Sequence, residues 1–150
     1  MKEPRYFEDF KLGEEFISSH FTFTPTDVIG FRRLYGGPLG SATVDDLDPS
    51  RLSVDLTQLL PTSFRLFYDT GATVPCGRGS PGMNEVRHLN PVYSGDTIRV
   101  VAKVRELRPS SSSPQRGTAE IAFSVLNQRD EIVLSFLVIQ LLGRRTDRPA

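Results

Sequence analysis

The last third of the chain carries segments in which apolar and polar residues alternate, and this pattern constrains the fold more than any other feature. Every second side chain is apolar from Thr97 to Val104 and again from Thr118 to Val125. A period of two places alternate side chains on opposite faces of a β-strand. Residues 109–114 between them are all Pro or Ser and predict a loop. The two segments are therefore expected to form a long hairpin.

A third strand is predicted from Glu131 to about Leu142, after the turn residues 127–130. This segment is apolar on both of its faces, which is typical of a strand in the middle of a sheet. Two interpretations stay open at this point. The second apolar face is covered by another copy of the chain, or it is covered within a monomer.

The first half of the chain is more helical. Thr24 and Pro25 have the character of an N-cap and a first helical residue, and Gly36 and the residues after it form a stop signal. A second helix is expected to begin at Asp48-Pro49. Its buried stripe at helical spacing comprises Leu56, Leu59, Leu60, Ser63, Phe64 and Phe67.

This second helix is expected to end near residues 69–71. Small Ser63 in the stripe allows a close approach to the sheet, while Pro61 is expected to kink the helix or to open a new one. A helical half packed on an antiparallel meander is an α+β arrangement.

Composition excludes several classes of function. The 18 basic residues balance the 18 acidic ones, so charge gives no reason to expect nucleic acid or a membrane as partner. The longest apolar stretch, 134–142, is too short to span a bilayer, and the N-terminus does not look like a signal peptide. We expect a soluble, cytoplasmic protein. With one cysteine, Cys76, no intrachain disulfide is possible, and neither a metal nor a cofactor is expected.

Residues 82–97, GMNEVRHLNPVYSGDT, resemble the segment that follows the central helix in the MaoC-like hydratase/dehydratase family. In that family a short strand carries an Arg, a Pro-Val turn follows, and Gly-Asp-Thr opens a long strand. The resemblance extends through Arg105, Arg116-Gly117, VLNQ at 125–128 and VLSF at 133–136. The N-terminal YFEDFKLG at 6–13 and the lead into the first helix at 22–27 are also similar.

This resemblance implies a hotdog fold, in which a curved antiparallel sheet wraps a long central helix, and a single domain over residues 1–150. It also implies an acyl-CoA or acyl-carrier thioester as ligand. The assembly implied is a homodimer, or a heterodimer with another hotdog subunit. The best-known activity of the family is the reversible hydration of 2-enoyl-CoA.

The catalytic residues of the family are not matched. Family hydratases carry an Asp and a His after the first helix, in a motif similar to Gly-Asp-x-Asn-Pro-x-His. These residues activate water and deliver a proton. When the chain is aligned on FRRLYG at 31–36, Gly37 stands at the Asp position and no His follows nearby. The two histidines of the chain, His20 in a predicted first strand and His88, are expected to be structural.

Other residues are candidates to replace the missing Asp and His. Asp45 and Asp46 are the candidates for the lost acid, although a solvated loop is the simpler explanation for them. By analogy with the family, Tyr35, Gly37, Gln58 and Gly82 are expected to line the thioester pocket. Tyr68 and Arg65 are better explained by helix packing and a solvated helix face. Cys76, expected in a flexible glycine-rich loop, lacks a neighbouring base and is not expected to be a nucleophile.

Three hypotheses follow from the sequence. The first is a divergent enoyl-CoA hydratase/dehydratase with altered acid and base groups. The second is a non-catalytic hotdog subunit that pairs with a dyad-bearing dehydratase. The third is a thioesterase-type hotdog protein that uses an Asp or Glu to activate water.

Overall fold

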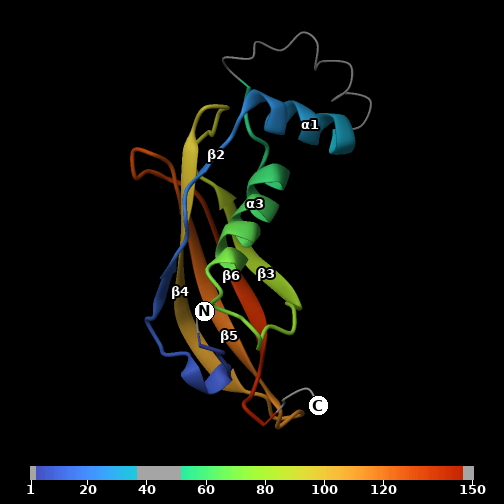
Figure 1. Cartoon of the computed structure of the whole chain (residues 1–150), viewed down its shortest axis with the longest axis vertical. Helices are drawn as coiled ribbons and strands as arrows, with labels where there is room; N and C mark the ends of the chain where they lie inside the picture. The colour runs from blue at the N-terminus through green and yellow to red at the C-terminus, as the bar shows by residue number, and fades with distance from the viewer. Residues whose placement is uncertain (1–2, 37–51, 147–150) are drawn as a thin grey trace.

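The computed structural model describes residues 3–36 and 52–146 (Figure 1). Its sheet has the order β1-β4-β5-β6-β3, and β2 also pairs with β4. In chain order the elements are η1 (Phe7–Asp9), β1 (Glu15–Ile17), β2 (Phe21–Thr22), α1 (Pro25–Tyr35), α3 (Leu56–Asp69), β3 (Gly82–His88), β4 (Thr97–Pro109), β5 (Arg116–Leu126) and β6 (Ile132–Gly143).

The predicted meander is confirmed. β4, β5 and β6 pair antiparallel in sequence order, and β6 lies between β5 and β3, as expected for a central strand. The side chains predicted on the apolar faces of β4 and β5 are buried, namely Ile98, Val100, Ala102, Val104, Ala119, Ile121, Phe123 and Val125. On β6, Phe136 and Val138 are buried, while Leu137 and Ile139 on the other face are only half-buried.

Bulges or irregularities interrupt three of the strand pairings, and one of them lies between Val125 and Leu126 where β5 pairs with β6. The pairing of β4 with β5 shifts between Val104 and Glu106, so that β4 continues to Pro109, five residues beyond the predicted end. The pairing of β3 with β6 shifts between Asn84 and Arg87. A bulge adds one residue on one strand and bends it locally. The bulge therefore ends the simple alternation from which the strand was predicted.

The predicted start and end of α1 are confirmed. The Thr24 side chain accepts a hydrogen bond from the Asp27 amide at 3.1 Å, and the Asp27 carboxylate accepts one from the Thr24 amide at 2.9 Å. This capping box satisfies two backbone donors that a helix start leaves without partners. At the other end, Gly36 is the C-cap and its N–H donates to the Arg32 carbonyl.

The predicted start of the second helix was wrong. α3 begins at Leu56, whereas Asp48 and Pro49 lie outside the described residues. The segment before α3 is extended, since the Val54 amide donates to the Val92 carbonyl at 2.7 Å. Pro61 lies inside α3 and does not open a new helix. The burial of the apolar face offsets the backbone hydrogen bond that proline removes.

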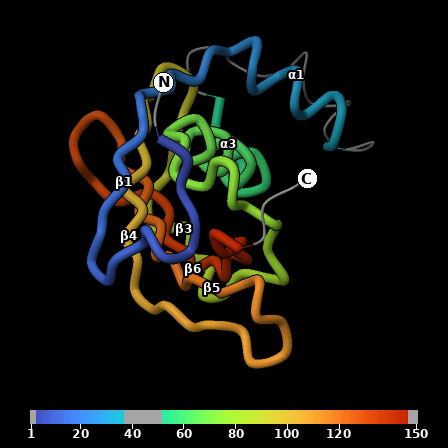
Figure 2. Tube along the Cα trace, turned by 60° about the horizontal axis from the view of Figure 1, so that its bottom comes forward, coloured from blue at the N-terminus to red at the C-terminus, as the bar shows by residue number. Residues whose placement is uncertain are grey.

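An aromatic cluster joins α3 to the sheet. The ring of Phe67 lies 4.9 Å from that of Phe123, and the ring of Phe64 lies 5.5 Å from that of Phe136. The sheet curves around α3, whereas α1 extends away from both (Figure 2). The expected α+β arrangement, with a helix enclosed by a curved antiparallel sheet, is confirmed. Within the described residues, no helix is long and apolar enough to cross a membrane.

Candidate functional site

The face of α3 against the sheet is closely packed. Leu59, Leu66 and Phe67 are buried on this face, and Ser63 is fully buried among them, as the sequence predicted. The Ser63 hydroxyl donates to the Leu59 carbonyl at 2.7 Å, which satisfies it without a polar partner from the sheet. This face of the helix therefore serves packing and presents no polar group to a ligand.

A second row of α3 is only partly covered. Leu60, Phe64 and Tyr68 follow each other at four-residue spacing, so they share one side of the helix. Phe64 contacts Phe136 of β6 and stacks on Tyr68 with ring centroids 6.0 Å apart. This row therefore faces β6 and the edge strand β3, which runs beside α3 in Figure 1.

The edge strand adds apolar side chains to the same side. Met83 pairs with buried Val138, so both side chains lie on the α3 face of the sheet, and Val86 packs against the core. Met83 is 40% exposed and Tyr68 is 44% exposed. We name this strip the α3–β3 seam and define it by Leu60, Phe64, Tyr68, Met83 and Val86. Leu60, Phe64 and Val86 pack against the core, whereas Tyr68 and Met83 are exposed to solvent.

Gln58 lies near the start of α3 and is 7% exposed. Its Nε2 donates to the backbone carbonyl of Asp27 at 3.1 Å and so ties α3 to α1. Its Oε1 is buried and has no hydrogen-bond partner within the described residues. Leaving a buried acceptor unsatisfied costs about 1–3 kcal/mol, so a donor placed beside this oxygen would stabilise the fold.

The other expected pocket residues do not join Gln58. Tyr35 ends α1, is 73% exposed and packs its ring on Phe31. It is eight residues from Asp27, or about 12 Å along the helix axis. Gly82 begins β3, which starts beyond the C-terminal end of α3 (Figure 1). Within one chain these three residues are dispersed. Gly37, Asp45 and Asp46 lie outside the described residues.

Neither histidine forms a catalytic pair in the described part of the chain. His20 was expected in a strand, but it is exposed in the connection between β1 and β2. His88 ends β3 and is also exposed. Within residues 3–36 and 52–146 no group of three His, Cys, Asp or Glu side chains is arranged to hold a metal ion.

Two carboxylates near α3 have structural partners. Asp27 belongs to the capping box of α1. Asp69 pairs with Arg65 at 3.0 Å on the solvated side of α3, which agrees with the solvated helix face expected for Arg65. Neither carboxylate is held in place to activate water for attack on a bound acyl group.

Cys76 is buried, not placed in a flexible loop. Its carbonyl accepts from the Gly143 amide at 2.7 Å, and the Arg78 amide donates to the Leu141 carbonyl at 2.8 Å, so this segment is held against the end of β6. Burial raises the pKa of the Cys76 thiol to about 11. The thiol is therefore protonated at neutral pH, and a nucleophilic role is disfavoured.

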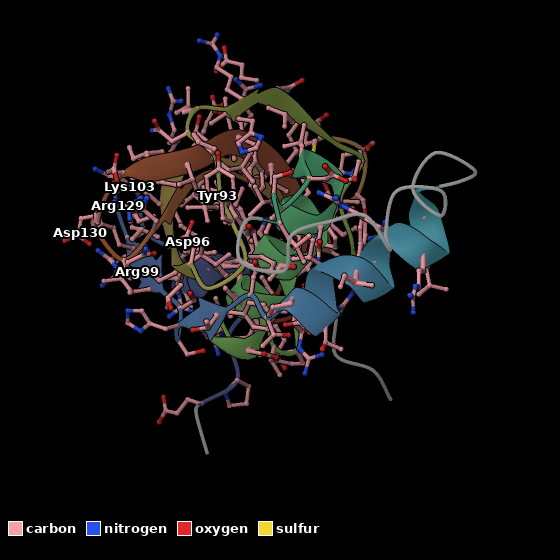
Figure 3. All side chains as sticks on the ribbon, turned by 90° about the horizontal axis from the view of Figure 1, so that it is seen from above. Tyr93, Asp96, Arg99, Lys103, Arg129 and Asp130 are labelled. Carbon is pink, nitrogen blue, oxygen red and sulfur yellow. The ribbon has the colours of Figure 1, made fainter. Side chains whose placement is uncertain are left out.

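The Gly-Asp-Thr segment at 95–97 forms a turn. Gly95 has a φ of +93°, and the Asp96 carboxylate accepts from the Tyr93 amide at 2.9 Å and from Nε2 of Gln128 at 2.8 Å. Figure 3 shows Asp96 between Tyr93 and Arg99, which pairs with Asp130 at 2.9 Å. These bonds fix the start of β4 to the β5–β6 turn. The motif that carries much of the family resemblance therefore has a structural role here.

Comparison with known proteins places this fold in a class. No protein-family model matches the chain, and no curated protein matches it. Solved structures do match. A monoamine oxidase regulatory protein from an Archaeoglobus species is 26% identical with a TM-score of 0.76, and the match covers 94% of this chain and 95% of that one.

Two further structures extend the comparison. A MaoC-like dehydratase from Rhodospirillum rubrum is 23% identical with a TM-score of 0.78, and the match covers 97% of this chain and 99% of that one. An R-hydratase from Pseudomonas aeruginosa is 19% identical with a TM-score of 0.66, and the match covers 93% of this chain and 86% of that one. A 3R-hydroxyacyl-ACP dehydratase complex is among the other matches.

The chain thus has a hotdog fold. Within that class its structural neighbours are MaoC-like dehydratases and hydratases, which confirms the resemblance seen in the sequence.

Proposed function

We propose that this protein binds acyl thioesters in the manner of a MaoC-like hydratase or dehydratase, with the acyl chain along the α3–β3 seam. The observation that carries the proposal is the partly exposed apolar strip at the edge of the enclosed helix. Exposed apolar area that continues into a core is suited to an alkyl chain, because each methylene removed from water contributes about 0.8 kcal/mol. The names of the neighbouring hydratase and dehydratase structures support the same ligand class.

The seam is open on the side of strand β3. This strand ends the sheet and is exposed over nearly its whole length. An uncovered edge strand offers unpaired backbone groups to another strand. We propose that a second hotdog subunit pairs here and covers the seam, either an identical chain or a different one.

Hydration of a 2-enoyl thioester requires two proton transfers. A base removes a proton from water as its oxygen bonds to the β-carbon, and an acid delivers a proton to the α-carbon. The described residues supply no His–carboxylate pair for these steps. We propose Asp45 or Asp46 for the acid/base role, with Tyr35, Gly37, Gln58 and Gly82 as lining residues. In the alternative, a dyad-bearing partner supplies the chemistry, and the glycine at position 37 favours this second candidate.

The test is turnover of crotonyl-CoA and of longer 2-enoyl thioesters, with free thiol followed in parallel. A divergent hydratase consumes the enoyl group without releasing thiol, and Asp45→Asn or Asp46→Asn lowers kcat at least about 100-fold. Asp55→Asn, just before α3, is the matched control and leaves kcat unchanged. Thiol release indicates a hydrolase instead.

The same assay separates the two candidate functions. A non-catalytic subunit shows no turnover alone but binds acyl-CoA, and it gains hydration activity when mixed with a dyad-bearing hotdog partner. Absence of both turnover and acyl-CoA binding, in the presence or absence of such a partner, would overturn the proposed function.

A further inference from the structure

A hollow opens on the face of the sheet that points away from α3. Its volume is about 290 Å³. Ser124 of β5 and Ser135 of β6 lie directly opposite each other in its floor. They alternate with Phe123 and Phe136, whose rings pack against α3 on the other face. The hollow is therefore separated from the α3–β3 seam by the thickness of the sheet.

Small side chains create the hollow. Ala122 and Ser135 pair with the long side chains Lys103 on β4 and Arg87 on β3, and Leu137 also pairs with Ala122. Both serines are half-buried, and neither hydroxyl has a hydrogen-bond partner among the described residues. Each hydroxyl can donate to an oxygen placed above it.

Two bulges direct charged side chains at this hollow. The β4 bulge leaves Arg105 as the extra residue between Val104 and Glu106, and the β3 bulge precedes Arg87. Both arginines line the hollow, from strands on opposite sides of β5 and β6. Bulges re-aim side chains and are frequent next to functional sites.

The β3 bulge also holds a strained residue. Glu85 has a φ of +53°, in the left-handed region that residues with a side chain seldom occupy. Glu85 is also one of the residues that line the hollow. Backbone strain of this kind persists where the surrounding structure, and often a function, requires it.

The charges of the two arginines are not neutralised. Neither Arg87 nor Arg105 has an ion pair or hydrogen bond within residues 3–36 and 52–146. Arg108 on the same strand, by contrast, pairs with Glu106 at 2.6 Å. With Glu85 as the one carboxylate in the lining described, the hollow has a net charge of +1.

We propose that this hollow binds a phosphoryl group. The guanidinium fork matches the oxygens of a phosphate and donates charge-assisted hydrogen bonds to them. The two serine hydroxyls donate from the floor, and Ala122 and Leu137 contact the apolar part of an ester. The volume is at the small end of the range for ligand sites, so the hollow accepts a phosphoryl group with a short attached piece. The proposal does not depend on the acyl-thioester function.

The test is a titration of the whole protein with inorganic phosphate, followed by amide chemical shifts of Ser124 and Ser135. Saturable binding is expected, and Arg87→Gln or Arg105→Gln each raises the Kd about fivefold. Arg108→Gln removes the same charge from the same face outside the hollow and changes the Kd less than about twofold. An equal effect of all three variants, or shifts that never saturate, would overturn the site.

Two further variants test the floor of the hollow and the sign of the charge that it prefers in a ligand. Ser124→Val replaces one of the two hydroxyl donors by an apolar group, keeps the net charge and suits a strand, so the Kd for phosphate rises about fivefold while the protein stays folded. Glu85→Gln removes the negative charge at the rim and lowers the Kd about twofold. Unchanged binding in Ser124→Val, or weaker binding in Glu85→Gln, contradicts the proposal.

The phosphoryl group can come from a small phosphate ester or from the nucleotide part of coenzyme A. CoA and dephospho-CoA, which lacks the ribose phosphate, distinguish the two sources. If Arg105→Gln weakens CoA but not dephospho-CoA, the ribose phosphate occupies the hollow. If it weakens inorganic phosphate alone, the ligand is a small ester. The dependence of acyl-CoA affinity on chain length is unaffected by this variant in either case.

Discussion

Replacing Phe67 by alanine tests whether α3 is held inside the sheet. The Phe67 ring is fully buried and lies 4.9 Å from Phe123 and 6.1 Å from Phe16, so it joins the helix to both β5 and β1. Truncating a buried Phe costs about 3–5 kcal/mol, through lost transfer free energy and the cavity that remains. A domain of this size has a free energy of unfolding of about 7–15 kcal/mol, so the variant folds but is much less stable.

The measurement is urea denaturation of Phe67→Ala beside Tyr68→Ala as control. Tyr68 is the next residue on the helix but is 44% exposed, so its truncation is expected to cost about 1 kcal/mol. In thermal unfolding, the Phe67 variant should lose roughly 8–15 °C. Equal losses for the two variants, with no change in the m-value, would show that Phe67 does not anchor the helix, and the enclosed position of α3 would be wrong.

Three other substitutions have expected outcomes that stability or labelling assays can check. Gly117→Ala places a Cβ 2.4 Å from the buried Phe7 ring and should cost about 1–3 kcal/mol, whereas Gly30→Ala in α1 meets nothing within 4 Å and should stabilise by about 0.5–1 kcal/mol; chemical denaturation of both gives the sign. Cys76 should react with a thiol reagent only after unfolding, and fast labelling of the native protein contradicts its burial. The pKa of Cys76 is raised to about 11 in the folded state, so the unfolded state loses its thiol proton first as the pH rises. The free energy of unfolding should therefore fall between about pH 9 and 11, by at most about 2.7 kcal/mol. Cys76→Ala should remove this part of the pH dependence of stability.

Much of the sheet could be predicted from the sequence, because apolar and polar residues alternate along a half-buried strand with a period of two. The prediction for β4 stopped at Val104 because the Arg105 bulge shifts the phase, and Leu107 resumes the buried face one residue out of step. No residue type marks such a bulge. The positions of Arg105 and Glu85 beside the hollow therefore could not be recognised from the sequence.

The helices show a different limit. Thr24 and Asp27 identify the start of α1, since a capping box is local and its two bonds need only neighbouring residues. The start of α3 was misplaced because Asp48-Pro49, like Thr24-Pro25, is a capping residue followed by a proline. The segment at Val54 is instead extended, since its amide donates a hydrogen bond to the Val92 carbonyl. That bond joins residues far apart in the sequence.

The candidate site was predicted only in part. Gln58 lies opposite the apolar stripe of α3, so its burial, like its bond to Asp27, depends on the packing of α1. The dispersal of Tyr35 and Gly82 depends on the directions of α1 and β3, which spacing in the sequence does not specify. The α3–β3 seam was missed because Met83 lies on an exposed edge strand with no alternation to mark it.

The most direct test of the central claim is the affinity of non-reactive thioether analogues of acyl-CoA with increasing chain length. If the alkyl chain lies in the α3–β3 seam, the Kd falls about two- to fourfold per methylene until the seam is filled. Met83→Asp should abolish this dependence, and Leu34→Asp, at a 76% exposed apolar position on α1, should leave it intact. A Kd that is independent of chain length, or that is unaffected by Met83→Asp, would contradict an acyl-binding seam.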